Sequence, residues 1–122
     1  LELVHLVAQF PEVESVNYTG LPENKYFELS TKQFGERPGA MFTFNLSSCE
    51  ACFSFMNKLK LVKRATNLFD NKTLAIHPAS TIFGTFTPEV RKAMNVSDKT
   101  IRISVGLEDV KDLYSDFEQA LQ

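Results

Sequence analysis

Two stretches of the chain alternate between apolar and polar residues with the two-residue period of a β-strand. One is residues 100–105, in which Ile101, Ile103 and Val105 alternate with Thr100, Arg102 and Ser104. The other is residues 40–46, in which Ala40, Phe42, Phe44 and Leu46 alternate with Met41, Thr43 and Asn45. Successive side chains of a strand point to opposite faces of its sheet. The pattern therefore predicts a sheet with one apolar face and places Arg102 on the other face.

Helical spacing of apolar residues marks several further segments. The first carries Leu3, Leu6, Val7 and Phe10 and ends at Pro11, which cannot continue a helical hydrogen-bond ladder. Residues 24–34 predict a second helix, which the glycines and proline of residues 35–39 terminate. Shorter strands are predicted over residues 13–18, 61–67 and 73–76, and Thr87-Pro88-Glu89 predicts the start of a short helix.

Two of the predicted helices begin at recognisable caps. Ser47 stands three residues before Glu50, which is the spacing of a capping box. The helix that follows buries Cys52, Phe53, Phe55, Met56 and Leu59. Glu108 or Asp109 caps the last helix, which turns Val110, Leu113, Phe117, Ala120 and Leu121 inward. Together these elements predict a two-layer α+β fold, with helices on one face of a mainly antiparallel sheet.

Length and composition limit the class of protein. With 122 residues, of which 43% are hydrophobic and 23% charged, we expect a single globular domain over residues 1–122. The net charge of -2 and the absence of a long basic run argue against a nucleic-acid surface. No apolar stretch approaches the length of a membrane span, so we expect no membrane contact and a cytoplasmic location.

The first residues are already in helical register and carry no initiator methionine. We therefore expect the first residue to lie within a helix that begins earlier in a longer protein, of which this chain is one part. Removing a domain from its neighbour exposes apolar surface, so we also expect the isolated chain to self-associate.

Cys49-Glu50-Ala51-Cys52 is the most obvious reactive motif, because a helix N-terminus can lower the pKa of a thiol. A zinc site would need two further ligands, yet His5 and His77 are remote from the motif and from each other in sequence. We interpret the cysteines as small, reduced helix residues and keep thiol-redox chemistry as an alternative. Ser30-Thr31-Lys32 resembles the tripeptide before a Schiff-base lysine, but we expect Lys32 to be a solvated helix residue.

Two segments carry candidate binding chemistry. Pro78 ends the preceding strand and leaves Ala79, Ser80 and Thr81 in a loop that can supply polar contacts. Arg102 on its strand presents a rigid guanidinium fork that suits a carboxylate or a phosphate. The alternatives are an ordinary strand-exit loop and a solvated arginine on an open sheet face.

Taken together, these segments resemble the C-terminal domain of the Cys/Met-metabolism pyridoxal-phosphate enzymes. The matching residues are His77-Pro-Ala-Ser-Thr81, Ile101 to Val110, Asp112-Leu113 and Asp116 to Leu121. Within that family, Val16 to Pro22 with Asn24-Lys25-Tyr26 is most similar to O-acetylhomoserine sulfhydrylase. The resemblance runs from about Val13 to Leu121, which is nearly the whole chain.

The resemblance implies the small, substrate-closing domain of a fold-type-I enzyme whose N-terminal domain binds pyridoxal 5'-phosphate. The family's arginine matching Arg102 grips the α-carboxylate of the amino-acid substrate, and the residues matching Ser80 and Thr81 add contacts through the loop. The implied parent reaction is a γ-replacement, in which acetate leaves O-acetylhomoserine and sulfide adds to give homocysteine. The cofactor carries the electron-sink chemistry, and we expect the parent to be a homo-oligomer.

Some family features have no counterpart in this chain. Ile82 and Phe83 stand where the family commonly has threonine and histidine, and Phe69 stands where it often has glycine. We also find no match to the cofactor lysine, the aspartate under the pyridine nitrogen, the phosphate-binding loop or the stacking tyrosine. We therefore expect the isolated chain to bind no cofactor and to be inactive.

Other parents and other classes of protein remain as alternatives. The parent could be a methionine or cystathionine γ-lyase or a cystathionine γ-synthase. The chain could also be a stand-alone domain that binds amino acids or a protein partner. In that case it should bind amino-acid carboxylates unaided, and Arg102→Ala should abolish binding without unfolding the chain.

Overall fold

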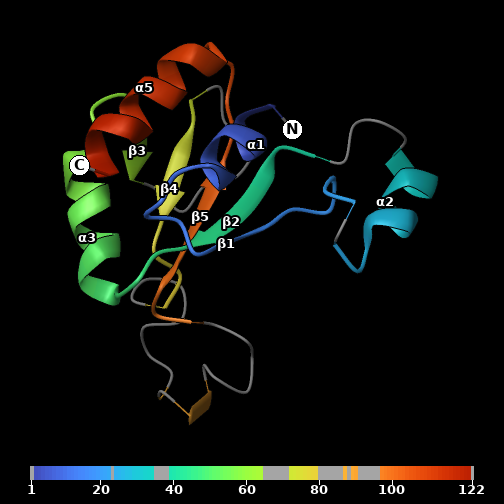
Figure 1. Cartoon of the computed structure of the whole chain (residues 1–122), viewed down its shortest axis with the longest axis horizontal. Coiled ribbons are helices and arrows are strands. Elements are labelled where there is room, and N and C mark those ends of the chain that lie inside the picture. Colours follow the sequence, from blue (N-terminus) through green and yellow to red (C-terminus); the bar gives the residue numbers. More distant parts are fainter. Residues whose placement is uncertain are drawn as a thin grey trace.

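The structure, a computed structural model, describes residues 2–22, 24–34, 39–64, 72–79, 87, 89–90 and 97–121. Its helices are α1 (Glu2–Ala8), α2 (Phe27–Phe34), α3 (Cys49–Lys58) and α5 (Val110–Leu121). Its strands are β1 (Ser15–Asn17), β2 (Met41–Asn45), β3 (Lys63–Arg64), β4 (Leu74–Ile76) and β5 (Thr100–Ser104). The sheet is mainly antiparallel and the helices form a layer of their own, which confirms the predicted α+β class (Figure 1).

The strands form one five-stranded sheet in the order β1-β2-β5-β4-β3. The pairs β1–β2, β2–β5 and β5–β4 are antiparallel, and β3 joins β4 in parallel at one edge. The centre of the sheet is β5, which comes from the C-terminal part of the chain and lies between β2 and β4 (Figure 1). The strand that carries Arg102 is therefore held on both sides.

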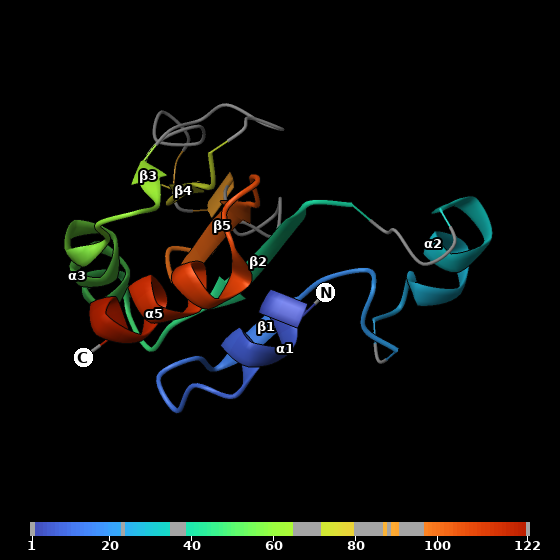
Figure 2. The same ribbon diagram turned by 90° about the horizontal axis from the view of Figure 1, so that it is seen from above.

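One layer of helices covers the apolar face of the sheet. The helices α1, α3 and α5 lie on the same side of the strands (Figure 2). Ile101 and Ile103 of β5 are fully buried beneath this layer together with Leu113 and Phe117 of α5. Rings from three elements meet there, because Phe55 packs edge-on against both Phe44 and Phe117 at centroid distances of 5.5 and 5.4 Å. The alternation read from residues 40–46 and 100–105 thus identifies the core correctly.

The helix α2 stands away from this two-layer body (Figures 1 and 2). The segment that carries it is closed at its base by the Tyr18 hydroxyl, which donates to the Gly39 carbonyl oxygen at 2.8 Å. The predicted start of this helix at residue 24 is wrong, because the side-chain oxygen of Asn24 accepts from the Tyr26 backbone N–H and forms a turn. The prediction of helices packed on one face therefore holds for α1, α3 and α5 but not for α2.

Of the two predicted N-caps, that of α3 lies one residue later in the structure and that of α5 is as predicted. Ser48, not Ser47, is the N-cap of α3, and its hydroxyl accepts from the Ala51 backbone N–H at 3.1 Å. Asp109 caps α5 through the Lys111 backbone N–H at 2.8 Å, as one of the two predicted alternatives. Near the short helix predicted after Pro88, the Val90 backbone N–H contacts the Thr87 hydroxyl at 3.3 Å, and the residues that follow lie outside the described ones.

The strands are shorter in the structure than predicted, and those predicted over residues 40–46 and 100–105 are Met41–Asn45 and Thr100–Ser104. The strand predicted over residues 13–18 is Ser15–Asn17, and the one predicted over 73–76 is Leu74–Ile76. The strand predicted over 61–67 is Lys63–Arg64, and residues 65–70 lie outside the described part of the chain. Among the described residues, every helix is too short or too polar to cross a bilayer.

Candidate functional site

The site is built on the sheet face that the helix layer does not cover. In the strand register, Arg102 of β5 lies between Thr43 of β2 and Ile76 of β4. Its neighbours Ile101 and Ile103 are fully buried on the opposite face. The predicted placement of Arg102 in the polar row of this strand is therefore confirmed. Because both neighbouring strands pair with β5, the backbone that carries the guanidinium is rigid.

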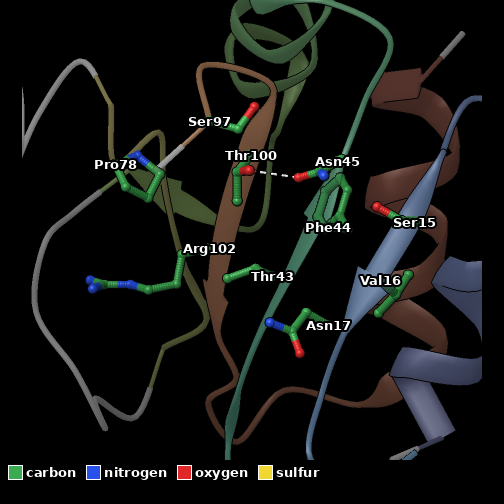
Figure 3. A pocket seen from close by; sticks show the side chains of 10 residues that line it. All are labelled: Ser15, Val16, Asn17, Thr43, Phe44, Asn45, Pro78, Ser97, Thr100 and Arg102. Atoms are coloured by element: carbon green, nitrogen blue, oxygen red, sulfur yellow. Dashed lines mark hydrogen bonds between the residues drawn. The ribbon is translucent and has the colours of Figure 1, made fainter. Parts of the chain in front are cut away.

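A pocket of about 410 Å³ opens on this face beside Arg102 (Figure 3). It is lined by Ser15, Val16, Asn17, Thr43, Phe44, Asn45, Pro78, Ser97, Thr100 and Arg102. The arginine side chain extends away from β2, toward the side of the pocket where Pro78 lies (Figure 3). None of these described lining residues is acidic, and Arg102 is the one cation among them. The pocket therefore favours an anionic group of a small ligand.

Hydrogen bonds hold the polar side chains of the pocket wall in place. The Thr100 hydroxyl donates to the side-chain oxygen of Asn45 at 2.6 Å, which links β5 to β2 (Figure 3). The Asn24 side-chain N–H donates to the side-chain oxygen of Asn17 at 2.7 Å. This second bond ties the start of the α2 segment to the strand at the sheet edge. The polar groups are thus largely pre-arranged before a ligand binds.

The loop after β4 forms another side of the pocket. The strand ends at Ile76, immediately before His77 and Pro78, as the sequence predicts. His77 is only 2% exposed, and its Nε2 lies 2.6 Å from the Asp98 carbonyl oxygen. The predicted site residues Ser80 and Thr81 lie outside the described residues, as do Phe69, Ile82 and Phe83.

The cysteine motif has the properties of a structural pair rather than of a reactive one. Burial raises the pKa of the Cys52 thiol to about 11, with a further rise from Cys49 and a partial offset from a backbone hydrogen bond at Leu46. Burial also raises the pKa of Cys49, and the nearby Asp98 and Glu50 charges add to the effect. Both thiols stay protonated at neutral pH, which opposes nucleophilic or redox use. The described residues contain no group of three side chains that could hold a metal ion.

The lysines that the structure describes do not fit a Schiff-base site. Such a lysine needs a desolvated pocket, which lowers the pKa of its amine. Lys32 is exposed on α2, as predicted, and the other lysine side chains with described surroundings are also exposed. These are Lys25, Lys58, Lys60, Lys72, Lys99 and Lys111. Each of these described lysines is therefore more solvated than a Schiff-base lysine would be.

Two carboxylates that no sequence pattern singles out are buried or half-buried in the structure. Asp116 of α5 is 6% exposed and accepts hydrogen bonds from the backbone N–H groups of Lys60, Leu61 and Val62 at 2.8 to 2.9 Å. Glu108 accepts from both the backbone N–H and the hydroxyl of Thr73. The available signal for Asp116 was its position beside Phe117, within the apolar stripe of its helix.

The chain thus has an α+β fold with a pocket, lined in part by Arg102, on the sheet face opposite the helix layer. Comparison with known proteins identifies its family, because residues 1–122 match the family of Cys/Met metabolism PLP-dependent enzymes. The chain belongs to this family.

Individual relatives carry more than one activity. The chain is 42% identical over 122 residues to O-acetyl-L-homoserine sulfhydrylase 1 of Thermus thermophilus, covering 99% of this chain and 29% of that protein. It is 40% identical over 121 residues to L-methionine gamma-lyase of Pseudomonas putida, covering 98% of this chain and 30% of that protein. The chain therefore spans about three-tenths of the length of these curated relatives.

The fold recurs in a solved enzyme structure that contains the cofactor. A protein of Campylobacter jejuni, described as a candidate O-acetylhomoserine (thiol)-lyase, matches with a TM-score of 0.92 and 32% identity. The match covers 98% of this chain and 29% of that protein, which carries an N'-pyridoxyl-lysine-5'-monophosphate group.

Proposed function

We propose that residues 1–122 are the C-terminal, substrate-closing domain of a PLP-dependent enzyme that makes homocysteine from O-acetylhomoserine and sulfide. Membership of the Cys/Met metabolism family and the similarity to O-acetyl-L-homoserine sulfhydrylase support this proposal. The short span of the chain relative to its relatives supports a domain rather than a complete enzyme. The cofactor and its lysine would then belong to the N-terminal domain of a homo-oligomeric parent.

The observation that carries the proposal is the placement of Arg102 on the central strand of the sheet, where it lines the pocket. A guanidinium donates two parallel N–H groups, which match the two oxygens of an α-carboxylate in both spacing and direction. A carboxylate bound in this way is oriented as well as held, because both oxygens are fixed. The role of this domain is therefore to grip and orient the amino-acid substrate while the other domain supplies the cofactor chemistry.

Ser80 and Thr81 complete the proposed carboxylate site. They follow Ala79 in the sequence, two and three positions beyond the pocket residue Pro78. A hydroxyl or backbone N–H from this loop would add donors to those of Arg102. A small zwitterion needs several convergent donors, because removing its charges from water is costly.

A methionine γ-lyase parent is the second candidate, because the identity to that enzyme, at 40%, is nearly as high as to the sulfhydrylase. Both reactions act on an amino acid with a leaving group on its γ carbon, so both need the same α-carboxylate grip. The products separate them. The complete enzyme should form homocysteine from O-acetyl-L-homoserine and sulfide, whereas a lyase should release methanethiol from L-methionine.

The test of the carboxylate role is Arg102→Lys in the complete enzyme, purified with its cofactor. Lysine keeps the positive charge but loses the fork, so we expect kcat/KM to fall at least about 30-fold, or ~2 kcal/mol. Lys111→Ala is the matched control, because it removes an exposed cation from α5 on the other side of the sheet. Wild-type kcat/KM in Arg102→Lys would contradict the proposed role.

A further inference from the structure

The ring of His77 is buried at the end of β4, between the helix layer and the turn that precedes β5. It is 2% exposed and lies against Phe53 of α3 with a ring centroid distance of 4.8 Å. Its Nε2 lies 2.6 Å from the Asp98 carbonyl oxygen. A carbonyl oxygen only accepts hydrogen bonds, so Nε2 carries the proton and donates it to this bond.

This hydrogen bond joins two walls of the Arg102 pocket. On one side, His77 is followed directly by Pro78, which lines the pocket. On the other side, Asp98 is preceded directly by Ser97, which also lines it. The side chain and backbone of His77 therefore fix both positions at once, and Arg102 extends toward the Pro78 side (Figure 3).

Between described residues, the turn on the Asp98 side has two further hydrogen bonds that bear on its position. Ser97 braces it internally, because its hydroxyl accepts from the Lys99 backbone N–H at 3.1 Å. The Lys99 carbonyl oxygen accepts from the Leu46 backbone N–H at 3.0 Å, which ties the turn to the end of β2. Among the described contacts, the bond from His77 is the one that ties this turn to the β4 side of the pocket.

We propose that His77 is a positioning residue, which sets the spacing between Pro78 and Ser97 and thereby the affinity of the Arg102 pocket for its amino-acid substrate. The inference rests on the proposed function. His77 is on the helix side of β4, below the pocket floor, because its side chain contacts Phe53 and Cys49 of α3. It therefore acts through the pocket walls and not by contact with the substrate.

The experiment compares two substitutions of His77 in the complete, cofactor-loaded enzyme with O-acetyl-L-homoserine as the substrate. His77→Phe keeps a ring against Phe53 but removes the donor, whereas His77→Gln keeps an N–H donor at a similar reach. We expect His77→Phe to raise KM about tenfold, with kcat within about twofold of wild type. We expect His77→Gln to bring KM back to within about threefold of wild type.

Cys49→Ala is the matched control, because the Cys49 sulfur also lies near the same nitrogen, at 3.9 Å from Nε2. It removes that weaker contact and leaves the donor to Asp98 in place, so KM should not change. A purely structural role would lower the thermal midpoint of His77→Phe and the active fraction of the enzyme without raising KM. An unchanged KM in folded His77→Phe, or equal KM values in the Phe and Gln variants, would overturn the inference.

The outcomes also separate this inference from the proposed function. If Arg102→Lys lowers kcat/KM while His77→Phe leaves KM unchanged, the carboxylate role stands and the role of His77 does not. If Arg102→Lys has no effect, the carboxylate role fails whatever His77 does. Should His77→Phe fail to fold, His77→Leu takes its place, because leucine also lacks the donor. A tenfold rise in KM that His77→Gln does not show supports the inference, and equal KM values in the two variants overturn it.

Discussion

The two faces of the sheet differ in whether helices cover them and in whether their residues form the core or line a pocket. On one face, Phe44, Ile101 and Ile103 are almost completely buried under helices. On the other, Thr43, Asn45 and Arg102 are half-buried and line a pocket. The same strand, β5, supplies residues to both faces at alternate positions. Stability and binding are therefore encoded on adjacent residues but should respond to substitution separately.

The comparison extends to two charged side chains. Asp116, on the helix side, accepts hydrogen bonds from three backbone N–H groups within the protein. Arg102, on the pocket side, lies where a small ligand can approach. A buried carboxylate that accepts hydrogen bonds from the backbone stabilises a fold, whereas a guanidinium that lines a pocket can contribute to ligand recognition. Substitutions of Asp116 should thus lower stability, whereas substitutions of Arg102 should mainly weaken ligand binding.

The largest effect on stability is expected from Phe117→Ala, which opens a cavity in the covered face. Phe117 is fully buried and packs against the rings of Phe55 and Phe44. Removing such a ring typically costs about 3–5 kcal/mol of unfolding free energy. Urea unfolding of the purified chain measures the loss, and Phe117→Leu, which keeps an apolar side chain, should lose less. A loss below about 1 kcal/mol for Phe117→Ala would contradict this view of the core.

Asp116→Ala should follow, with a loss of about 2–4 kcal/mol, because it leaves three backbone donors without their carboxylate. These donors belong to the link between α3 and β3, so the loss should be felt in the helix layer. The measurement is again urea unfolding, with Asp112→Ala, an exposed aspartate of the same helix, as the control. Equal stabilities of the two variants would contradict the structural role of Asp116.

The same carboxylate predicts a pH dependence. Burial alone would raise the pKa of Asp116, but hydrogen bonds from the backbone N–H groups of Val62, Lys60 and Leu61 and from the Gln119 side chain lower it below its ordinary value of 3.8. A lowered native pKa stabilises the fold above the unfolded value, and this contribution disappears as pH falls through the native value. The stability gap between wild type and Asp116→Asn should therefore be constant near neutral pH and shrink below about pH 4. A stability difference that widened as the pH fell would contradict a lowered pKa of Asp116.

Sequence alone predicts the covered face well, because alternation and helical spacing are local signals. Arg102, Ile101 and Ile103 were all assigned to the correct faces. The alternation also puts Ser104 in the polar row with Arg102, but Ser104 is buried there, at 2% exposed. Burial on that face depends on what covers the sheet there, which a period-two pattern does not encode.

The pocket itself depends on contacts between distant parts of the chain. The bond from His77 to Asp98 and the bond from Thr100 to Asn45 join residues 21 and 55 positions apart. No local pattern predicts which polar side chains meet in this way. Asp116 was missed for the same reason, since its donors lie more than 50 positions earlier in the chain.

The smallest effect on stability is expected from Thr43→Val, on the open face beside Arg102. Valine keeps the β-branched shape that suits a strand, and Thr43 is only half-buried, so unfolding free energy should stay within about 0.5 kcal/mol of wild type. The same substitution removes a hydroxyl from the pocket wall that faces the proposed substrate site. In the complete enzyme it should therefore change KM more than the thermal midpoint. Destabilisation comparable to that of Phe117→Ala would mean that the open face also holds the fold together, and the separation between the two faces would not hold.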